Sequence, residues 1–236
     1  LKSTLCRVLH DQLRPLVAGG GSDAQYMLRS DDSKSDSGSS SVESVHVRAP
    51  EFDDPSMQRM WINVSEILFE NRIGVGASGS TYAARWAGRR VAVKVVGTSG
   101  SDNIVAWQTE VQVLKTLDHP NIIQFMGYVE TPPTYIVVLE YCSGGDVYTA
   151  LRKGTPPRFF QNVANGLVAG MSHMHAHSII HRDLKSSNLL LDVDAWSMGG
   201  FAVKLIDFGV ARHVTGLNSE DLTTETGTYR WMAPEV

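Results

Sequence analysis

Two stretches of this sequence combine residue types that handle phosphate groups. The first is a glycine-rich run from Gly74 to Gly79, and Lys94 follows it. Backbone N–H groups of a glycine-rich turn can surround phosphate oxygens, and a nearby lysine adds positive charge. A dinucleotide-binding turn would need a helix after the last glycine, and a Walker A loop would need a lysine where Ser80 stands. A strand-like pattern follows instead, so the run indicates a glycine-rich hairpin over phosphates. A plain hairpin tip is the alternative.

The second stretch places acidic and amide side chains at short spacing. It reads His-Arg-Asp-Leu-Lys-Ser-Ser-Asn from His181 to Asn188, and Asp-Phe-Gly follows at Asp207. Mg²⁺ prefers hard oxygen ligands, which Asn188 and Asp207 provide. Asp183 can accept the proton of a substrate hydroxyl or orient that hydroxyl. Phosphoryl transfer needs neutralised charge and an aligned nucleophile more than covalent help from the protein, and these residue types supply both.

The hydrophobic pattern predicts two strands around the lysine. Segments 81–86 and 91–96 have strand character and are joined by a turn at Gly88-Arg89. Alternation along the second strand separates two sets of side chains, Val91, Val93 and Val95 on one face and Ala92, Lys94 and Val96 on the other. A lysine held on a strand face needs a partner of opposite charge.

A helix is predicted to supply that partner. Apolar residues recur at helical spacing over 103–117, with Ser101 or Asp102 as the cap. Glu110 is the acid in the interior of this helix, so we expect it to pair with Lys94. The remaining apolar segments predict further strands at 135–141, 189–191 and 203–206, and a helix at 159–175.

These motifs stand in the order of one enzyme family. With Val91-Ala92-Val93-Lys94 upstream and Ala233-Pro234-Glu235 at the end, the sequence resembles the eukaryotic protein kinases over residues 61–236. The Lys-Ser-Ser-Asn variant at 185–188 and the segment 227–232 are similar to the tyrosine-kinase-like group, near the Raf-like and mixed-lineage MAP kinase kinase kinases. The resemblance implies an α+β, two-lobed fold with a small β-rich N-lobe and an α-rich C-lobe.

The resemblance divides the chain into three parts. Residues 61–139 would form the N-lobe, and residues 140–236 the hinge and the first part of the C-lobe. The family's C-lobe continues past the Ala-Pro-Glu motif, so we expect this one to be incomplete. We expect residues 1–60 to be largely disordered, because segment 30–44 is rich in serine and acids and has almost nothing to bury. That segment is either a phosphorylation target or a plain spacer.

The resemblance also implies roles for single residues. The catalytic residues would be Asp183, Lys185, Lys94 and Glu110. Lys94 would hold the α- and β-phosphates of ATP, and Lys185 would contact the γ-phosphate. The Mg²⁺ ligands would be Asn188 and Asp207. The ATP site would be lined by Ile73, Gly74, Val75, Gly76, Ala77, Ser78, Gly79, Thr81, Ala92, Lys94, Leu139, Glu140, Cys142 and Asp146.

Adenine and substrate recognition are implied in the same way. Leu139 would be the gatekeeper, the backbones of Glu140 and Cys142 would bind the adenine edge, and Asp146 would bind ribose. A lysine two residues after the catalytic aspartate, with Thr228 bracing that aspartate, matches Ser/Thr kinases rather than tyrosine kinases. Two positions depart from the family pattern, because Ser78 replaces an aromatic residue and Thr81 replaces a valine.

Regulation and metal binding rest on weaker signals. Arg182 precedes the catalytic aspartate, and kinases with this arginine commonly use it to bind a phosphate on the activation loop. We hypothesise that phosphorylation of an activation-loop threonine raises activity, the candidates being Thr223, Thr224 and Thr226. An ordinary polar loop is the alternative. His173 and His177 share a helix face, but the absence of a nearby Cys or acid disfavours a metal site.

Composition argues against several functional classes. The chain has 236 residues with 21 Lys+Arg and 25 Asp+Glu, and this net charge of −4 argues against a nucleic-acid binder. No apolar segment approaches the roughly 20 residues that cross a bilayer. Cys6 and Cys142 form no Cys-x-x-Cys pair, which favours a reducing compartment and hence the cytoplasm.

Segment 192–201 is longer than the family's usual turn, and is either a surface insertion or retained non-coding sequence.

The sequence therefore predicts a Ser/Thr protein kinase that uses ATP and Mg²⁺ to phosphorylate a protein, with a MAP kinase kinase as one candidate substrate. The alternative from another class is a nucleotide-binding or interaction module, either a pseudokinase or a catalytically incompetent fragment. Pseudokinases usually lack one of three residues, and here Lys94, Asp183 and Asp207 are all present. Their presence favours the enzyme for the full-length product, whereas the C-lobe helices expected to be missing favour the non-catalytic module for this chain.

Overall fold

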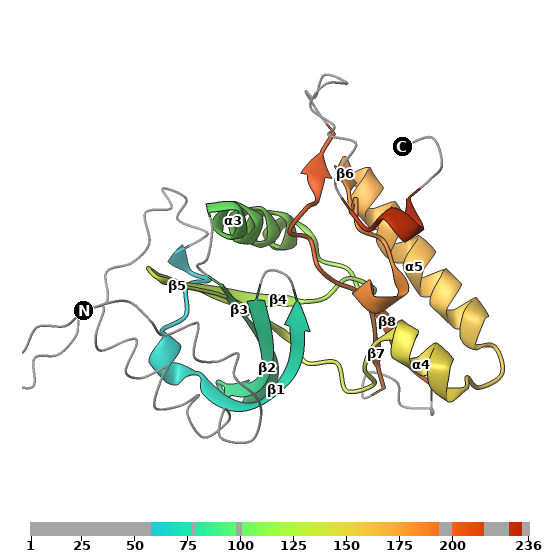
Figure 1. The fold of residues 1–236 in the computed structure, drawn as a ribbon, viewed down its shortest axis with the longest axis horizontal. Coiled ribbons are helices and arrows are strands. Elements are labelled where there is room, and N and C mark those ends of the chain that lie inside the picture. Colours follow the sequence, from blue (N-terminus) through green and yellow to red (C-terminus); the bar gives the residue numbers. More distant parts are fainter. Residues whose placement is uncertain (1–57, 77–78, 98–100, 194–199, 215–226, 233–236) are drawn as a thin grey trace, which may run out of the picture.

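The computed structural model describes residues 58–76, 79–97, 101–193, 200–214 and 227–232, without the side chains of residues 101 and 102. These residues form two parts, a sheet with the helix α3 above it and a part that contains the helices α4 and α5 (Figure 1). The chain passes from the first part to the second after strand β5. The predicted two-lobed α+β fold is confirmed.

The small lobe is built on one antiparallel sheet. Its strands, in spatial order, are β1 (Leu68–Gly76), β2 (Gly79–Trp86), β3 (Arg89–Val96), β5 (Thr134–Glu140) and β4 (Phe125–Thr131). Ala87 and Gly88 form the turn between β2 and β3, and both have positive φ. A two-residue hairpin loop with this backbone matches the right-handed twist of its strands. The predicted turn at Gly88-Arg89 lies one residue too late, because Arg89 already pairs with Trp86.

The two faces of β3 belong to different hydrophobic clusters. Val91, Val93 and Val95 pack against the segment before β1, which contains the 3₁₀ turn η2 (Val64–Glu66). Ala92 and Val96 pack on the opposite face, in the cluster that includes α3. The predicted alternation is confirmed, and it places Lys94 on the face that looks toward α3 and the large lobe.

Helix α3 (Ser101–Thr116) is fixed to the sheet by its tryptophan. Trp107 is 1% exposed, and its Nε1 donates a hydrogen bond to the Ile136 carbonyl at 3.1 Å. The helix begins two residues earlier than predicted, so Asp102 lies in the first turn and Ser101 is the first helical residue. Because Glu110 lies almost one turn after Trp107, this anchor also sets the position of the Glu110 carboxylate.

The large lobe combines helices with short strands. Its elements are α4 (Val147–Lys153), α5 (Phe159–Ala176), β6 (Ile179–Ile180), η3 (Ser186–Asn188), β7 (Leu189–Asp192), β8 (Ala202–Leu205), β9 (Arg212–His213) and η5 (Tyr229–Trp231). Strands β7 and β8 form a two-stranded sheet, and β6 pairs with β9. The predicted helix at 159–175 and the strands at 189–191 and 203–206 are confirmed to within one residue.

The loop between α3 and β4 is hydrogen-bonded to the large lobe. Asn121 donates a hydrogen bond from Nδ2 to the Val203 carbonyl at 2.9 Å, so this loop is tied to β8. Helix α5 approaches the same place through Gly166, where an added Cβ would lie 2.9 Å from the Val203 Cβ. A side chain here would force Val203 or Asn121 to shift, so glycine permits the close packing of α5 on β8 and the loop.

Candidate active site

A lysine and two carboxylates meet between the lobes. The Nζ atom of Lys94 on β3 lies 2.7 Å from Glu110 of α3 and 3.0 Å from Asp207, which follows β8. The Lys94 side chain is 16% exposed and that of Glu110 is 3% exposed. The ion pair expected from the sequence between Lys94 and Glu110 is present. The structure adds Asp207 to it, so one ammonium group joins both lobes.

This arrangement keeps the lysine charged. Burial by itself lowers the pKa of Lys94, but the carboxylates of Glu110 and Asp207 outweigh burial and raise this pKa above its ordinary value. Burial likewise tends to raise the pKa of Asp207, and Lys94 reverses that effect, so the pKa of Asp207 is lowered. Both groups are ionised at neutral pH and can act as fixed charges.

A second cluster surrounds the carboxylate of Asp183, which lies in the loop after β6. Lys185 donates a hydrogen bond from Nζ to Asp183 Oδ2 at 2.6 Å, and Asn188 donates from Nδ2 to the same oxygen at 3.1 Å. The Thr228 hydroxyl donates to Asp183 Oδ1 at 2.6 Å and accepts from Lys185 at 3.0 Å. The contact expected between Thr228 and Asp183 is present, and three donors fix the carboxylate.

The amide of Asn188 has a defined orientation. Its Nδ2 atom also donates to the Asp183 carbonyl at 2.8 Å, so both of these hydrogen bonds use the nitrogen. The amide oxygen is therefore the atom left to bind a ligand. An amide oxygen and the carboxylate of Asp207 are the type of donor that Mg²⁺ prefers.

His181 holds the two acidic segments in place, and the sequence analysis gave it no role. It is 1% exposed, and its ring bonds the Ile206 carbonyl through Nε2 at 3.0 Å and the Asp183 backbone N–H through Nδ1 at 3.3 Å. The second contact requires Nδ1 to accept, so Nε2 carries the proton and donates. Burial lowers the pKa of His181, which favours this neutral ring. The sequence signal that could have indicated a role for His181 is its position in the His-Arg-Asp motif, two residues before Asp183.

The predicted ATP-site residues of the hairpin lie on three neighbouring strands. Ile73 to Gly76 are on β1, Gly79 and Thr81 on β2, and Ala92 on β3. Thr81 is opposite Lys94 in the register, which brings the hairpin next to the buried lysine. An added Cβ on Gly79, whose φ is +149°, would clash with the Val95 carbonyl. Ala77 and Ser78 lie outside the described residues.

The predicted hinge residues are the last two residues of β5 and Cys142, which follows the strand. Leu139 is buried near the end of this strand. Glu140 uses its side chain elsewhere, because Oε1 lies 2.7 Å from both the Gln124 backbone nitrogen and Lys204 Nζ. With Oε1 in these two contacts, the backbone of Glu140 stays the part proposed to bind adenine. Burial raises the pKa of the Cys142 thiol to about 12, so this thiol stays protonated.

Asp146 has a structural contact that the sequence analysis did not assign. Its carboxylate accepts from the Thr149 backbone nitrogen at 2.7 Å and from the Thr149 hydroxyl at 2.8 Å, and it caps the N-terminus of α4. Asp is among the preferred N-cap residues, and this preference was a readable signal. A contact with ribose stays a prediction.

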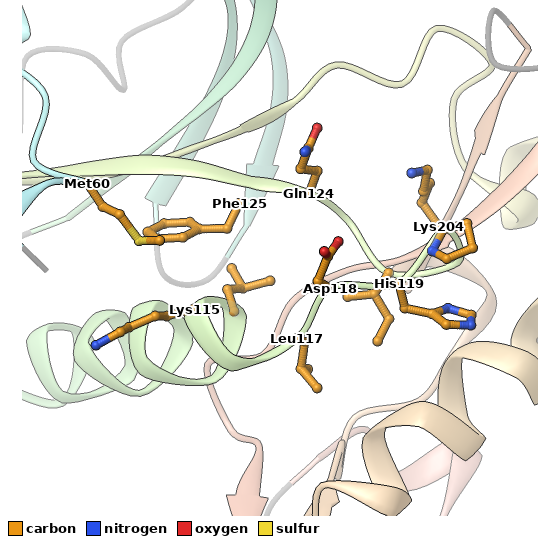
Figure 2. Close-up of a pocket in the computed structure, with 11 residues that line it drawn as sticks. Met60, Lys115, Leu117, Asp118, His119, Gln124, Phe125 and Lys204 are labelled. Carbon is orange, nitrogen blue, oxygen red and sulfur yellow. The ribbon is translucent and has the colours of Figure 1, made fainter. Parts of the chain in front are cut away.

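Two further features lie apart from these clusters. A pocket of about 610 Å³ lies between the C-terminal end of α3, the following loop and β8, with Met60 and Phe125 at one end and Lys204 at the other (Figure 2). None of the predicted site residues lines it.

The rings of His173 and His177 lie 4.4 Å apart. Within the described residues, no group of three or more His, Cys, Asp or Glu side chains could hold a metal ion.

The residues that frame these clusters match a known domain. A model of the protein kinase domain matches residues 68–236. The chain belongs to the protein kinase family.

Relatives of this kinase chain include both groups that its motifs resemble. It is 39% identical over 183 residues to serine/threonine-protein kinase STY46 of Arabidopsis thaliana, a match that covers 74% of this chain and 30% of the relative. It is 36% identical over 180 residues to mitogen-activated protein kinase kinase kinase 12 of Rattus norvegicus, covering 75% and 19%. The human mitogen-activated protein kinase kinase kinase 13 is 36% identical over 166 residues, covering 70% and 16%. The matched part is thus less than a third of each relative's length.

The kinase motifs at the end of the chain are described only in part. Gly227 to Met232 are described, whereas Thr223, Thr224, Thr226 and the Ala-Pro-Glu motif lie outside the described residues. Residues 1–57 and 194–199 also lie outside them. No helix among the described residues is long and apolar enough to cross a membrane.

Proposed function

We propose that this chain is a Ser/Thr protein kinase that transfers the γ-phosphate of ATP to a serine or threonine hydroxyl of a protein substrate. The observation that carries the proposal is the hydrogen-bonded carboxylate of Asp183, which Lys185, Thr228 and Asn188 hold. Its fixed orientation suits a group that accepts the hydroxyl proton or aligns the hydroxyl for in-line attack. The relatives' names as serine/threonine kinases support the same substrate class.

The same geometry supports a role for each charged side chain near the nucleotide. We infer that Lys94, held by Glu110, binds the α- and β-phosphates, and that Lys185 neutralises charge on the γ-phosphate. Asn188 and Asp207 would hold Mg²⁺, which when bound shields the phosphate oxygens and orients the β- and γ-phosphates. The backbones of Glu140 and Cys142 would bind the adenine edge, between Leu139 and the hairpin.

The role in the cell is also a proposal. Two relatives are named mitogen-activated protein kinase kinase kinases, which supports a place in a signalling cascade and a MAP kinase kinase as substrate. The cysteine usage supports a cytoplasmic location. Phosphoryl transfer to a purified MAP kinase kinase, compared with an unrelated Ser/Thr protein at equal concentration, tests the substrate. Equal rates on both proteins would remove this assignment.

Regulation by phosphorylation has support from two arginines. Arg212 on β9 lies close enough to Arg182 to lower its pKa, after the larger effect of burial. Two neighbouring guanidinium groups suit a phosphate. We infer that phosphorylation of Thr223, Thr224 or Thr226 raises activity through these arginines. Unchanged activity after alanine substitution of all three threonines would contradict this.

The deciding experiment is phosphoryl transfer from radiolabelled ATP with Mg²⁺ to a generic Ser/Thr protein, by the chain and by its Asp183→Asn variant. We expect transfer by the chain and a loss of about 10²- to 10⁴-fold in the variant. ADP binding, measured in parallel, should be similar in both, because Asp183 lies outside the predicted nucleotide contacts. Tight ADP binding without transfer by the chain would instead support a nucleotide-binding module.

A further inference from the structure

An arginine stacks on the hinge next to the proposed adenine site. The guanidinium carbon of Arg90, at the start of β3, lies 4.1 Å from the centroid of the Tyr141 ring. Tyr141 stands between Glu140 and Cys142, whose backbones are the proposed adenine contacts. A cation over an aromatic face at this distance is attracted by the ring's electrons. The contact therefore restrains the hinge residue that separates the two adenine-binding peptides.

The strand register explains why this arginine reaches Tyr141. Ala92 pairs with Leu139 and Val91 with Glu140 across β3 and β5. The same antiparallel register, continued by one residue, places Arg90 opposite Tyr141. Alternation puts Arg90 on the same face of β3 as Ala92 and Lys94, which is the face of the proposed nucleotide site. Lys94, Ala92 and Arg90 thus form a row along β3 that runs from the proposed phosphate contact toward the proposed adenine contacts, and Arg90 is at the adenine end.

An acid on β1 orients the Arg90 side chain. Glu70 Oε2 lies 3.4 Å from Arg90 Nε, and Glu70 Oε1 lies 3.0 Å from Arg85 Nε. Arg85 and Arg90 are directly opposite in the β2–β3 register, an arrangement in which two like charges repel. Glu70 offsets this repulsion and binds the Nε edge of Arg90. The flat face of the guanidinium is then free to lie on the Tyr141 ring.

We propose that Arg90 is a positioning residue for ATP, which stacks on Tyr141 and holds the hinge backbone in the geometry that binds adenine. The inference rests on the proposed function, because it requires ATP to bind at this hinge. Arg90 favours the hinge geometry that binds ATP, acts alike in the ATP complex and in the transition state, and lies away from the Asp183 cluster. Its loss should therefore weaken nucleotide binding and leave the chemical step unchanged.

The test compares two arginines that share Glu70 but differ in their contact with the hinge. Arg90→Ala should raise the Kd for ADP and the KM for ATP by about 2- to 5-fold, the range expected for one exposed cation–π contact, with kcat unchanged. Arg85→Ala is the matched control, because Arg85 binds Glu70 and is the more exposed of the two, 61% against 47%. It should leave the Kd for ADP unchanged. Arg90→Lys, which keeps a cation without the flat face, should fall between the chain and Arg90→Ala.

A double-mutant cycle with Tyr141→Leu identifies the partner. If Arg90 acts through the ring, Arg90→Ala should have no further effect on ADP binding in the Tyr141→Leu background. Equal ADP affinity for Arg90→Ala and Arg85→Ala would overturn the inference and leave the proposed function intact, and so would additive effects in the cycle. Failure of the unmodified chain to bind ADP would overturn the proposed function and this inference together.

Discussion

The hydroxyl of Thr228 joins two of the proposed catalytic side chains, Asp183 and Lys185, and its removal is a sharp test of their arrangement. It donates to Asp183 Oδ1 at 2.6 Å and accepts from Lys185 Nζ at 3.0 Å. Thr228→Val keeps the shape of the side chain and removes both contacts. Asp183 then keeps only the donors on Oδ2, which come from Lys185 and Asn188. The carboxylate can rotate about its Cβ–Cγ bond and lose its alignment with the substrate hydroxyl.

The size of the effect follows from the type of bond. A hydrogen bond to a charged group contributes about 1.5–3 kcal/mol. If that energy is lost in the transition state, kcat falls by about 10- to 150-fold. Thr228 is partly exposed and lies outside the two hydrophobic clusters, so the midpoint of thermal unfolding should change little. The large effect on rate and the small effect on stability separate a catalytic defect from misfolding.

The assay is steady-state transfer of the γ-phosphate to a generic Ser/Thr protein, with ADP affinity measured on the same preparations. Thr228→Ser is the control, because it keeps the hydroxyl and should retain most of the rate. A Thr228→Val rate within threefold of the unmodified chain would refute the reasoning. Equal losses in the Val and Ser variants would also refute it, since the hydroxyl would then not be the group that matters.

Three further predictions concern ionisable side chains. Glu110→Gln should lower kcat/KM for ATP at least 10-fold, because Lys94 keeps only Asp207 as a charged partner. Steady-state kinetics at varied ATP concentration check this, and an unchanged kcat/KM contradicts it. Lys204→Met should lower the free energy of unfolding by about 1–3 kcal/mol, since it leaves the Glu140 carboxylate without its cation, and urea denaturation measures the loss. Burial lowers the pKa of His119, so the contribution of its neutral ring to stability should be complete above pH 6.5, the ordinary histidine value, and be lost as the pH falls below it. Urea midpoints at pH 5.5, 6.5 and 7.5 check this, and His119→Gln should reduce the slope.

The features that the sequence predicted well share a strong local pattern. The alternation of valines in β3 fixed which face carries Lys94, and the apolar periodicity of α3 left Glu110 as its interior acid. Strand β4 and helix α4 were not predicted. Gly127 interrupts β4, where burial does not alternate, and α4 has only seven residues, too few for a helical period to emerge.

The contacts that the sequence could not predict join residues that are far apart along the chain. Glu140 and Lys204 form their ion pair only because the loop after α3 ties the hinge and β8 together. The stack of Arg90 on Tyr141 depends on the pairing of β3 with β5, which α3 and β4 separate in sequence. Local periodicity carries no information on such pairings, so these charged residues were indistinguishable from solvent-exposed ones.

The pair of residues proposed to bind Mg²⁺ shows what short strands contribute to such a site. Asn188 directly precedes β7, Asp207 lies two residues after the end of β8, and the ladder pairs Leu189 with Leu205. An antiparallel pair brings the start of its first strand to the end of its second, so the two ligands meet at one end of the β7–β8 sheet. The backbone bond from Ile206 N–H to the Asn188 carbonyl, at 3.0 Å, closes that end. Any length of chain between β7 and β8 preserves this geometry if the register is kept. We therefore expect deletion of residues 195–198 to leave phosphoryl transfer within threefold of the unmodified chain. Leu205→Pro should abolish transfer, because it removes the backbone N–H that bonds the Asn121 carbonyl at 2.9 Å beside the site.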